Sequence, residues 1–384
     1  SSTKGLDFST NRNLITVSGV APLEVRTLLI NGIALPVSWT TLTNWTVRIP
    51  LRAGVNALAI AGVDVHGASV PAASATMHIT FTGVEELPQE KIVINEIHYN
   101  PLLAGTGFIE LLNRSTTSAF DLSGWRLSGA GFVFPPGTTL EPNTYIVVVQ
   151  DLGAFSVAFG PMSAVVGEYG GNLKPGGETI TLIKPGATPE LDQVIDQVTY
   201  DSAPPWPAAA NGLGASLQLV DPSQDNNRVA NWATATGTQK KATPGASNSV
   251  RVTLTPIPPL WLNELCPTNP VVGARPPRLD VAGQADPWLE LYNGGTNTVS
   301  LSGYYLANQP GNLVQWPFPP GAAISPGGFL LVWVDGDASQ SAAGELHTSF
   351  RVDPVAGTVL LTRGPATNNI IDYLSYRTPV AGRS

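Results

Sequence analysis

The stretch IVINEIHYNP at Ile92–Pro101 is nearly repeated as LWLNELCPTNP at Leu260–Pro270. The residues that follow also repeat, because FIELLN, LSGW and FPPG after the first copy match WLELYN, LSGY and FPPG after the second. Alternating apolar residues bounded by turn residues are typical of β-strands. Two domains of one kind therefore occupy most of the chain.

The composition of the 384-residue chain favours many short strands over long helices. Charged residues make up 12% of the chain, about half the usual share, while 39 Gly and 34 Pro supply turns. The net charge of −8 argues against a nucleic-acid partner, because phosphate binding rewards a basic surface. Low charge with many small polar residues indicates an extracellular or cell-surface protein. Cys266 is the sole cysteine, so no internal disulfide can form, and no apolar run approaches the roughly 20 residues that span a bilayer.

Domain boundaries follow from the repeat and from turn-rich segments. The N-terminal segment has five or more short strands, and Asn31-Gly32 between two apolar runs predicts a type I′ hairpin. The predicted organisation is a sandwich at 1–82, a linker at 83–91, a sandwich at 92–248, a linker at 249–259 and a sandwich at 260–384.

The third domain lacks a counterpart of the residues that end the second one, including an apparent strand at Ser216–Val220. Either the third domain is naturally shorter, or the chain has been cut from a longer protein. We favour truncation at its C-terminus, because natural proteins usually cover an apolar sheet edge.

The combined pattern I-x-I-N-E-I, F-I-E-L-x-N, L-S-G-W/Y and F-P-P-G resembles the lamin-tail domain, an immunoglobulin-like β-sandwich. The resemblance spans Ile92–Asn248 and Leu260–Tyr376. It implies a non-catalytic module that occurs in nuclear lamins and in many secreted or surface proteins of bacteria. No catalytic or cofactor-binding residue can be carried over from this family. The N-terminal segment, with VSGVAP and LLINGIALP, resembles a bacterial immunoglobulin-like module. The expected fold is therefore all-β, with three consecutive immunoglobulin-like β-sandwich domains.

Four glutamates at repeated positions are candidates for chemistry or for metal binding: Glu96 and Glu110 in the first copy, and Glu264 and Glu290 in the second. Glu96 is in phase with Ile92 and Ile94, and Glu110 with Phe108, so both are expected on mostly apolar faces. A carboxylate pair can coordinate Ca²⁺ or perform acid–base work. The structural alternative, which we favour, is that each carboxylate accepts N–H groups from a neighbouring loop.

Asparagines accompany the glutamates and are expected to cap strand ends and turns; they are Asn95, Asn113, Asn263 and Asn293. Asp335 and Asp337 form a short Asp-Gly-Asp loop that offers further oxygen ligands. Because this loop does not match the EF-hand pattern, an ordinary turn is favoured over calcium binding. Calcium is the only cofactor that these patterns suggest.

Four aromatic side chains are candidates for ligand stacking: Trp206, Trp232, Trp316 and Phe318. Exposed rings can stack on sugars or anchor a partner protein, whereas the structural alternative places them in cores. The four histidines are scattered without zinc-site spacing, and Cys266 takes the place of His98 in the repeat.

These patterns predict a non-catalytic, extracellular region of a larger exported bacterial protein that gives structural spacing, adhesion or assembly. An enzyme is not expected, because no nucleophile elbow or phosphate-binding loop occurs. The alternative is a carbohydrate- or polymer-binding accessory region of a secreted hydrolase. Expected partners are other surface proteins or extracellular polysaccharide, and further covalently linked domains.

Overall fold

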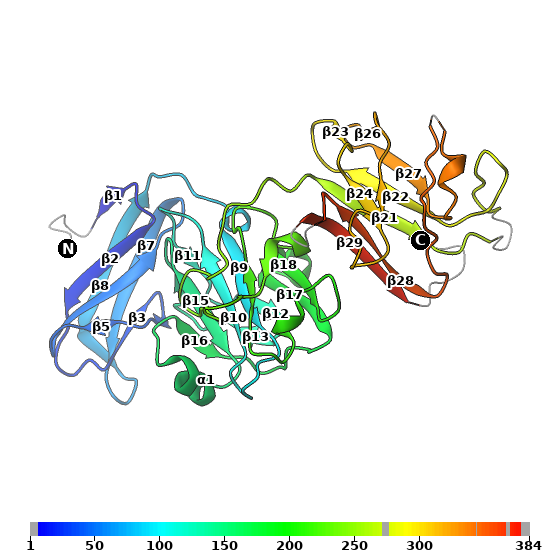
Figure 1. The fold of residues 1–384 in the computed structure, drawn as a ribbon. Coiled ribbons are helices and arrows are strands. Elements are labelled where there is room, and N and C mark those ends of the chain that lie inside the picture. Colours follow the sequence, from blue (N-terminus) through cyan, green and yellow to red (C-terminus); the bar gives the residue numbers. More distant parts are fainter. Residues whose placement is uncertain (1–6, 271–275, 343, 366–368, 378–384) are drawn as a thin grey trace. The chain divides into compact units, whose positions relative to one another are not determined.

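The computed structural model describes residues 7–270, 276–342, 344–365 and 369–377. Strands dominate these ranges, and α1 (Leu152–Phe159) is the one α-helix within them (Figure 1). The predicted all-β class is thereby confirmed. No helix in the described part of the chain is long and apolar enough to cross a membrane.

The chain divides into two compact units whose boundaries interleave in sequence. The first unit comprises residues up to Asp201 together with Ala209–Pro222 and Thr234–Arg251. The second comprises Ser202–Ala208, Ser223–Ala233 and the residues from Val252 onward.

The first unit begins with a two-sheet sandwich. Its sheets have the strand orders β1-β8-β7-β3-β4 and β2-β6-β5, and Leu28, Val47 and Ile79 from both sheets share one core. Asn31 and Gly32 have φ of 51° and 78°, which confirms the predicted hairpin. The strands are β1 (Phe8–Thr10), β2 (Leu14–Val20), β3 (Thr27–Ile30), β4 (Ile33–Ala34), β5 (Ser38–Trp39), β6 (Asn44–Pro50), β7 (Gly54–Val63) and β8 (Ser69–Phe81).

The first repeat, residues 92–248, follows the short 3-10 helix η1 (Pro88–Glu90). One of its sheets contains the order β16-β15-β10-β9-β19, a second has the order β13-β12-β17-β18, and β11 pairs with β14. The elements are β9 (Ile92–His98), β10 (Phe108–Asn113), β11 (Phe120–Asp121), β12 (Arg126–Ser128), β13 (Phe132–Val133), β14 (Thr139–Leu140), β15 (Tyr145–Val149), β16 (Val165–Glu168), β17 (Gly177–Lys184), η2 (Pro189–Leu191), β18 (Gln193–Asp201), η3 (Ala208–Ala210) and β19 (Leu217–Leu219).

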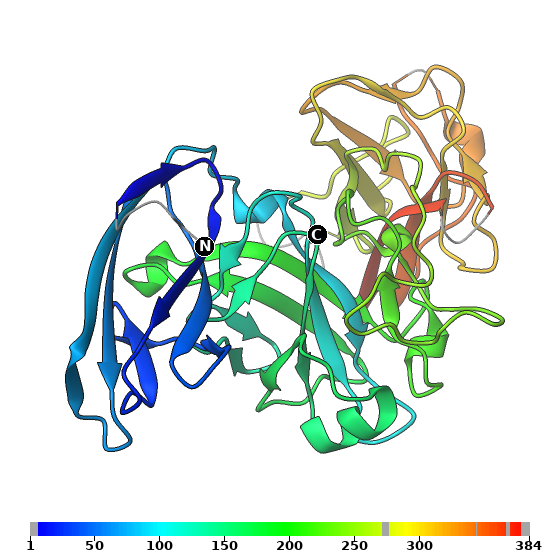
Figure 2. The same cartoon turned by 90° about the vertical axis from the view of Figure 1, so that its left-hand side faces the viewer.

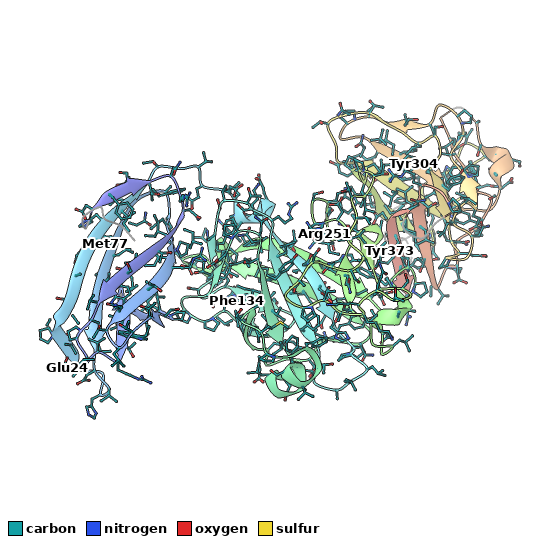
Figure 3. The ribbon with its side chains drawn as sticks, turned by 60° about the vertical axis from the view of Figure 1, so that its left-hand side comes forward. Glu24, Met77, Phe134, Arg251, Tyr304 and Tyr373 are labelled. Carbon is teal, nitrogen blue, oxygen red and sulfur yellow. The ribbon has the colours of Figure 1, made fainter. Side chains whose placement is uncertain are left out.

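Every residue of β9 and β10 is buried, because both faces of this sheet are covered. The face that carries Phe108 packs against Phe155 of α1 and against Ala242. The helix α1 begins after Asp151, whose side chain accepts a hydrogen bond from the Ala154 N–H, and it lies at the end of the sheet next to β16 (Figures 1 and 2). Phe134, labelled in Figure 3, is fully buried in the same repeat.

A β-bulge at Asn95 changes the phase of β9. Glu96 lies opposite Glu110 and Ile94 lies opposite Leu111, so Asn95 is the extra residue. Glu96 therefore shares a face with Glu110, and the prediction that it is in phase with Ile94 is wrong. Strict alternation along the strand does not apply across a bulge.

The second repeat, from Leu260 onward, has the sheets β21-β22-β27, β25-β24-β28-β29 and β23-β26. Asn263 is the matching bulge, because Glu264 lies opposite Glu290 and Leu262 lies opposite Leu291. The elements of this unit are η4 (Val229–Asn231), β20 (Trp232–Ala233), β21 (Leu260–Cys266), β22 (Trp288–Asn293), β23 (Val299–Ser300), β24 (Tyr305–Ala307), β25 (Trp316–Pro317), β26 (Ala323–Ile324), β27 (Phe329–Trp333), η5 (Ala338–Gln340), β28 (Ala356–Thr362) and β29 (Ile370–Arg377).

Candidate functional site

The glutamate pair of the first repeat is fully enclosed, and all four of its carboxylate oxygens accept hydrogen bonds. Glu96 Oε1 accepts from Ser216 Oγ at 2.5 Å and from the Thr243 N–H at 2.8 Å, and Glu96 Oε2 accepts from Thr243 Oγ1 at 2.7 Å. Glu110 Oε1 accepts from Asn95 Nδ2 at 2.8 Å, and Glu110 Oε2 accepts from the Gly245 N–H at 2.5 Å. The pair therefore ties β9 and β10 to the segment around Thr243.

Asn248 completes this network. Its Nδ2 donates to the carbonyls of Asn95 and Leu219, and its Oδ1 accepts from Asn95 Nδ2. Gly245 has a φ of 74°, in the left-handed region that glycine adopts without strain. The Thr-Pro-Gly-Ala-Ser-Asn sequence is thus shaped to present the Thr243 N–H to Glu96, the Gly245 N–H to Glu110 and the Asn248 amide to the bulge of β9.

Burial sets the protonation of the pair. It raises the pKa of Glu96 to about 7, although the hydrogen bonds from Ser216 and Thr243 oppose the shift. Burial, followed by the neighbouring charge of Glu96, raises the pKa of Glu110 well above its ordinary value. Ionising both enclosed carboxyl groups has a high free-energy cost. The folded state is therefore more stable when these groups are protonated.

The glutamate pair of the second repeat has the same backbone register but no such enclosure. Asn263 Nδ2 donates to Glu290 Oε1 at 2.9 Å, which reproduces the bond between Asn95 and Glu110. Asn263 and Glu264 are exposed and Glu290 is half-buried. Of the first repeat's network, the described part of the second repeat therefore shows the one bond from the bulge asparagine to the strand glutamate.

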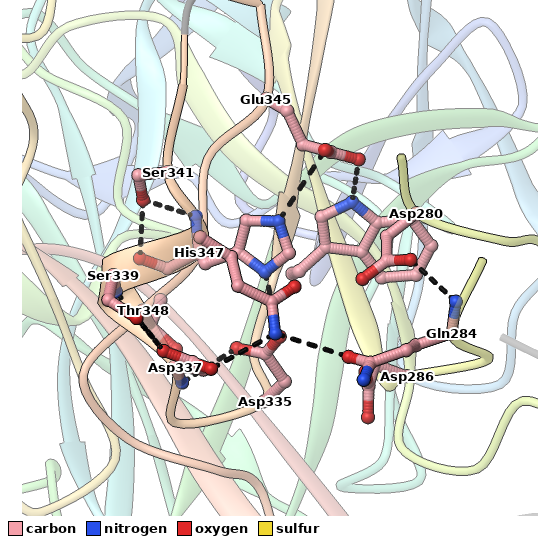
Figure 4. A network of polar contacts seen from close by, with 12 residues as sticks. Asp280, Gln284, Asp286, Asp335, Asp337, Ser339, Ser341, Glu345, His347 and Thr348 are labelled. Atoms are coloured by element: carbon pink, nitrogen blue, oxygen red, sulfur yellow. Dashed lines mark hydrogen bonds and ion pairs between the residues drawn. The ribbon is translucent and has the colours of Figure 1, made fainter. Parts of the chain in front are cut away.

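A second polar cluster surrounds His347, which is fully buried (Figure 4). Its Nδ1 lies 2.7 Å from Asp335 Oδ2 and its Nε2 lies 3.7 Å from Glu345 Oε2. Glu345 Oε1 accepts from Trp333 Nε1 at 2.9 Å, and the Trp333 ring stacks on the imidazole. Composition and spacing did not indicate this cluster, because its acidic residues approach His347 only through the fold of the loops.

The contacts of the His347 cluster are those of a structural network that stabilises the surrounding loops. Ser341 Oγ contacts the backbone N–H and C=O of His347 and not its ring, so this hydroxyl is not placed for activation by the imidazole. Asp337 is exposed and accepts from Ser339 as the cap of η5. Within the described ranges, no group of three or more His, Cys, Asp or Glu side chains is placed to hold a metal ion.

The four aromatic candidates are buried, with exposed fractions between 3% and 6%. Trp206 Nε1 donates to the Tyr373 hydroxyl at 2.7 Å, and Trp206 lies beside Trp232 (Tyr373 is labelled in Figure 3). Trp316 and Phe318 pack edge to face in the core of the second repeat. This burial agrees with the structural alternative, in which the four rings lie in cores, and not with exposed rings that stack on a ligand.

Arg228 is an important residue that the sequence did not single out. Its guanidinium lies 3.0 Å from the centroid of the Trp261 ring, and its Nη1 donates to the carbonyls of Leu260 and Ile371. Asp372 lies 3.9 Å from the same nitrogen. The Asp-Asn-Asn-Arg loop reads as an ordinary turn, so only the fold reveals an arginine that is 3% exposed.

Comparison with known proteins agrees with the repeat. A family model described as Lamin Tail Domain matches twice, at residues 86–202 and 262–378. A comparison with curated proteins finds no match. Among solved structures, a DUF4876 family protein from Bacteroides thetaiotaomicron is 13% identical over 64% of this chain and 95% of that chain, with a TM-score of 0.23, which is too low to establish a shared fold. Because the two family matches cover more than half of the chain and coincide with its repeated strands, the chain belongs to the lamin tail domain family, whose modules are immunoglobulin-like and generally non-catalytic.

Proposed function

We propose that this chain is a non-catalytic modular region of a larger exported bacterial protein, where it provides structural spacing, adhesion or assembly at the cell surface. The N-terminal sandwich is, in this proposal, a bacterial immunoglobulin-like module that extends the same region. The low share of charged residues and the many small polar residues support a place outside the cell. Its partners are other surface proteins or extracellular polysaccharide, and further domains are covalently attached.

The main support for the non-catalytic part of this proposal is the hydrogen bonding of the paired carboxylates. Every oxygen of Glu96 and Glu110 accepts a hydrogen bond from the chain itself. A general acid or base needs an oxygen that reaches a substrate proton. These side chains therefore act as ties between strands and not as reagents.

A turnover assay tests the non-catalytic part of the proposal. The purified chain is incubated with ester, glycoside and phosphodiester substrates beside the Glu110→Gln variant and a matched control, Glu24→Gln, at an exposed position. We expect rates equal to the buffer blank for all three proteins. Turnover that is present in the parent and control and lost in Glu110→Gln would overturn the proposal.

Surface labelling of cells tests the proposed location, and pull-down with polysaccharides tests the proposed binding. We expect a membrane-impermeant reagent to label this chain on intact cells. Protection of the chain from the reagent would contradict a surface location. The accessory-region alternative relied on exposed aromatics, and the burial of Trp206, Trp232, Trp316 and Phe318 removes that support. Saturable binding to a polysaccharide would restore it.

A further inference from the structure

The N-terminal sandwich is joined to the first repeat by a pair of hydrogen bonds at Asn13. Asn13 Nδ2 donates to the Ala119 carbonyl at 2.7 Å, and the Ala119 N–H donates to Asn13 Oδ1 at 2.8 Å. The Asn13 carbonyl accepts from the Leu51 N–H at 2.6 Å, which anchors the same residue in its own sandwich. Because Ala119 is buried, water competes little for this pairing. The two bonds together fix both the distance and the direction of the contact.

A glycine turn of the first repeat provides a second contact. Gly137 ends the Phe-Pro-Pro-Gly sequence, and a Cβ atom at this position would lie 2.7 Å from Pro36 Cδ and 2.9 Å from Leu35 Cδ2. These distances are shorter than van der Waals contact, so a side chain here would push the segment after β4 away. Gly321 ends the matching sequence of the second repeat, and a Cβ atom there would meet nothing within 4 Å among the described residues. The close approach is therefore a property of the first repeat.

An ion pair provides a third contact at the same junction. Arg48 Nη1 lies 2.6 Å from Glu141 Oε2, and Arg48 belongs to β6 in the second sheet of the N-terminal sandwich. The Arg48 side chain is 54% exposed, so the pair adds little stability. It does add direction, because Asn13, Pro36 and Arg48 come from three different segments of the sandwich. A hinge at any one of these contacts would break the other two.

The connecting segment, residues 83–91, is itself held against the first repeat. Glu86 accepts a hydrogen bond from Ser115 Oγ. Arg114 Nη2 donates to the Glu90 carbonyl at 2.5 Å. Flexible linkers remain random coils because they lack such contacts. The connecting segment therefore supports the junction and does not act as a free tether.

The junction is held at discrete points and not by a continuous apolar interface. A cavity of about 1010 Å³ lies beside the Gly137 contact, and Leu35, Pro135, Glu141 and Tyr145 are among the residues that line it. Removing one contact is therefore expected to loosen the junction without opening the core of either sandwich.

We propose that the N-terminal sandwich and the first repeat form one rigid body, whose orientation is fixed by the junction contacts of Asn13, Pro36, Arg48, Ala119, Gly137 and Glu141. Modules of one chain move relative to each other unless their interface prevents it. In this arrangement the N-terminal sandwich extends the first repeat as a stiff spacer. The inference rests on the spacing role proposed above and deepens it by naming the contacts that set the spacing.

A distance measurement between two spin labels tests the proposal on the full 384-residue chain. The labels are attached at Glu24→Cys and Val157→Cys, which are exposed positions of the N-terminal sandwich and of α1. A Cys266→Ala background removes the native thiol. We expect one narrow distribution of label distances for this parent. Asn13→Ala should broaden the distribution because both bonds to Ala119 are lost.

Gly137→Ala should broaden or displace the distribution, because the new methyl group pushes Pro36 away. Gly321→Ala is its matched control, since Gly137 and Gly321 have φ of 82° and 85° and both substitutions carry the same backbone strain. Gly321→Ala should give the distribution of the parent. If only Gly137→Ala changes it, the contact with the N-terminal sandwich is the cause.

Hydrogen exchange with mass spectrometry provides a second measurement. Protection of the Ala119 amide should fall about tenfold in Asn13→Ala, which is the effect of losing one hydrogen bond. Unchanged protection of β7 shows that the N-terminal sandwich is still folded. If Asn13→Ala also lowers the protection of β7, the comparison of Gly137→Ala with Gly321→Ala decides the matter.

Two results would overturn the proposal. The first is a broad distribution in the parent, because the N-terminal sandwich then swings on its connecting segment. The second is a distribution that stays as narrow in the combined variant Asn13→Ala/Gly137→Ala as in the parent, since these contacts then do not set the orientation. Neither result bears on turnover or on labelling of intact cells, so failure here is distinguishable from failure of the proposed function.

Discussion

Asn95 and Asn248 exchange two hydrogen bonds, each 2.9 Å long, across 153 residues of sequence. One donor is the Asn95 amide, which also bonds to Glu110, and the other is the Asn248 amide, which bonds to the backbone of the bulge. The bulge of β9 is thus held by a turn that enters from the far end of the repeat.

This relationship predicts different costs for the same substitution in the two repeats. Asn95→Ala should lower the free energy of unfolding of the first unit by about 2 kcal/mol or more, because it leaves the buried Glu110 Oε1 without its donor. Asn263→Ala, at the matching exposed position, should change stability by less than about 0.5 kcal/mol. Urea unfolding followed by tryptophan fluorescence measures both, and equal losses would contradict the network described here.

Arg228 should be essential to the second unit. Arg228→Ala should cost about 3 kcal/mol, because it removes the cover of Trp261 and leaves the half-buried Asp372 without its arginine. Arg228→Lys should recover only part of the loss, since lysine lacks the planar guanidinium that stacks on a ring. The matched control is Arg377→Ala at the exposed end of β29. Thermal unfolding of the three variants decides the matter, and a neutral Arg228→Ala would refute this role.

The buried glutamates should make the first unit less stable as pH rises. The folded-state pKa of Glu96 is raised to about 7 from an ordinary 4.5, so the folded state binds more protons than the unfolded state between these values. The contribution of protonated Glu96 is complete below about pH 4.5 and is lost as pH rises through 7, on the order of 3 kcal/mol in total.

Glu96→Gln should reduce that dependence by removing one of the two titrating groups, and Glu110 accounts for what remains. The glutamine can keep the hydrogen bonds, because its amide can donate to the Thr243 hydroxyl while its carbonyl keeps the other two donors. Glu264→Gln is the matched control and should leave the dependence unchanged. Unfolding free energies at pH 5 and pH 7.5 provide the comparison. A dependence that is as steep in Glu96→Gln as in the parent would show that Glu96 is not responsible.

The two aspartates of the Asp-Gly-Asp loop should behave differently. Asp335→Ala should destabilise the second unit by about 2 kcal/mol, because it leaves the buried His347 Nδ1 without its partner. Asp337→Ala removes only the cap of an exposed 3-10 turn and should cost less than about 1 kcal/mol. Thermal unfolding of both variants tests the difference, and the reverse order would be inconsistent with the contacts of His347.

Calcium should leave the unfolding temperature of the parent protein unchanged. A ligand that binds the folded state raises its stability in proportion to the logarithm of its concentration above the dissociation constant. The oxygens of Glu96 and Glu110 are already acceptors within the chain. Scanning calorimetry in millimolar calcium and in chelator measures the effect, and a reproducible rise with calcium would indicate a metal site.

The repeat made much of the fold predictable. Asn31 and Gly32 form the predicted hairpin, and the two copies share further contacts, because Asp196 and Asp372 accept from the Ile94 and Leu262 N–H groups in the same way. Asn113 and Asn293 were expected to cap turns, and the Nδ2 of each donates to three backbone carbonyls. Such positions are predictable because their partners are close in sequence or recur in both copies.

The remainder depended on long-range contacts that leave no local pattern. The bulge at Asn95 reversed the face of Glu96, and an Asn-Glu pair by itself does not distinguish a bulge from regular strand. Thr243 and Asn248 lie outside the stretches that match between the two copies, so the repeat gives no signal for them. The burial of Trp206 and Arg228 follows from a segment of one repeat folding with the next.

The interleaving of the two units constrains how such a chain can be inherited. Residues Ser202–Ala208 and Ser223–Ala233 fold with the second unit, while Ala209–Pro222 and Thr234–Arg251 fold with the first. A recombination breakpoint at the apparent repeat boundary after Asn248 would deprive the downstream module of Arg228, and an earlier breakpoint would deprive the upstream module of Asn248. No single crossover separates the pair cleanly, so gene shuffling is expected to move the two repeats together.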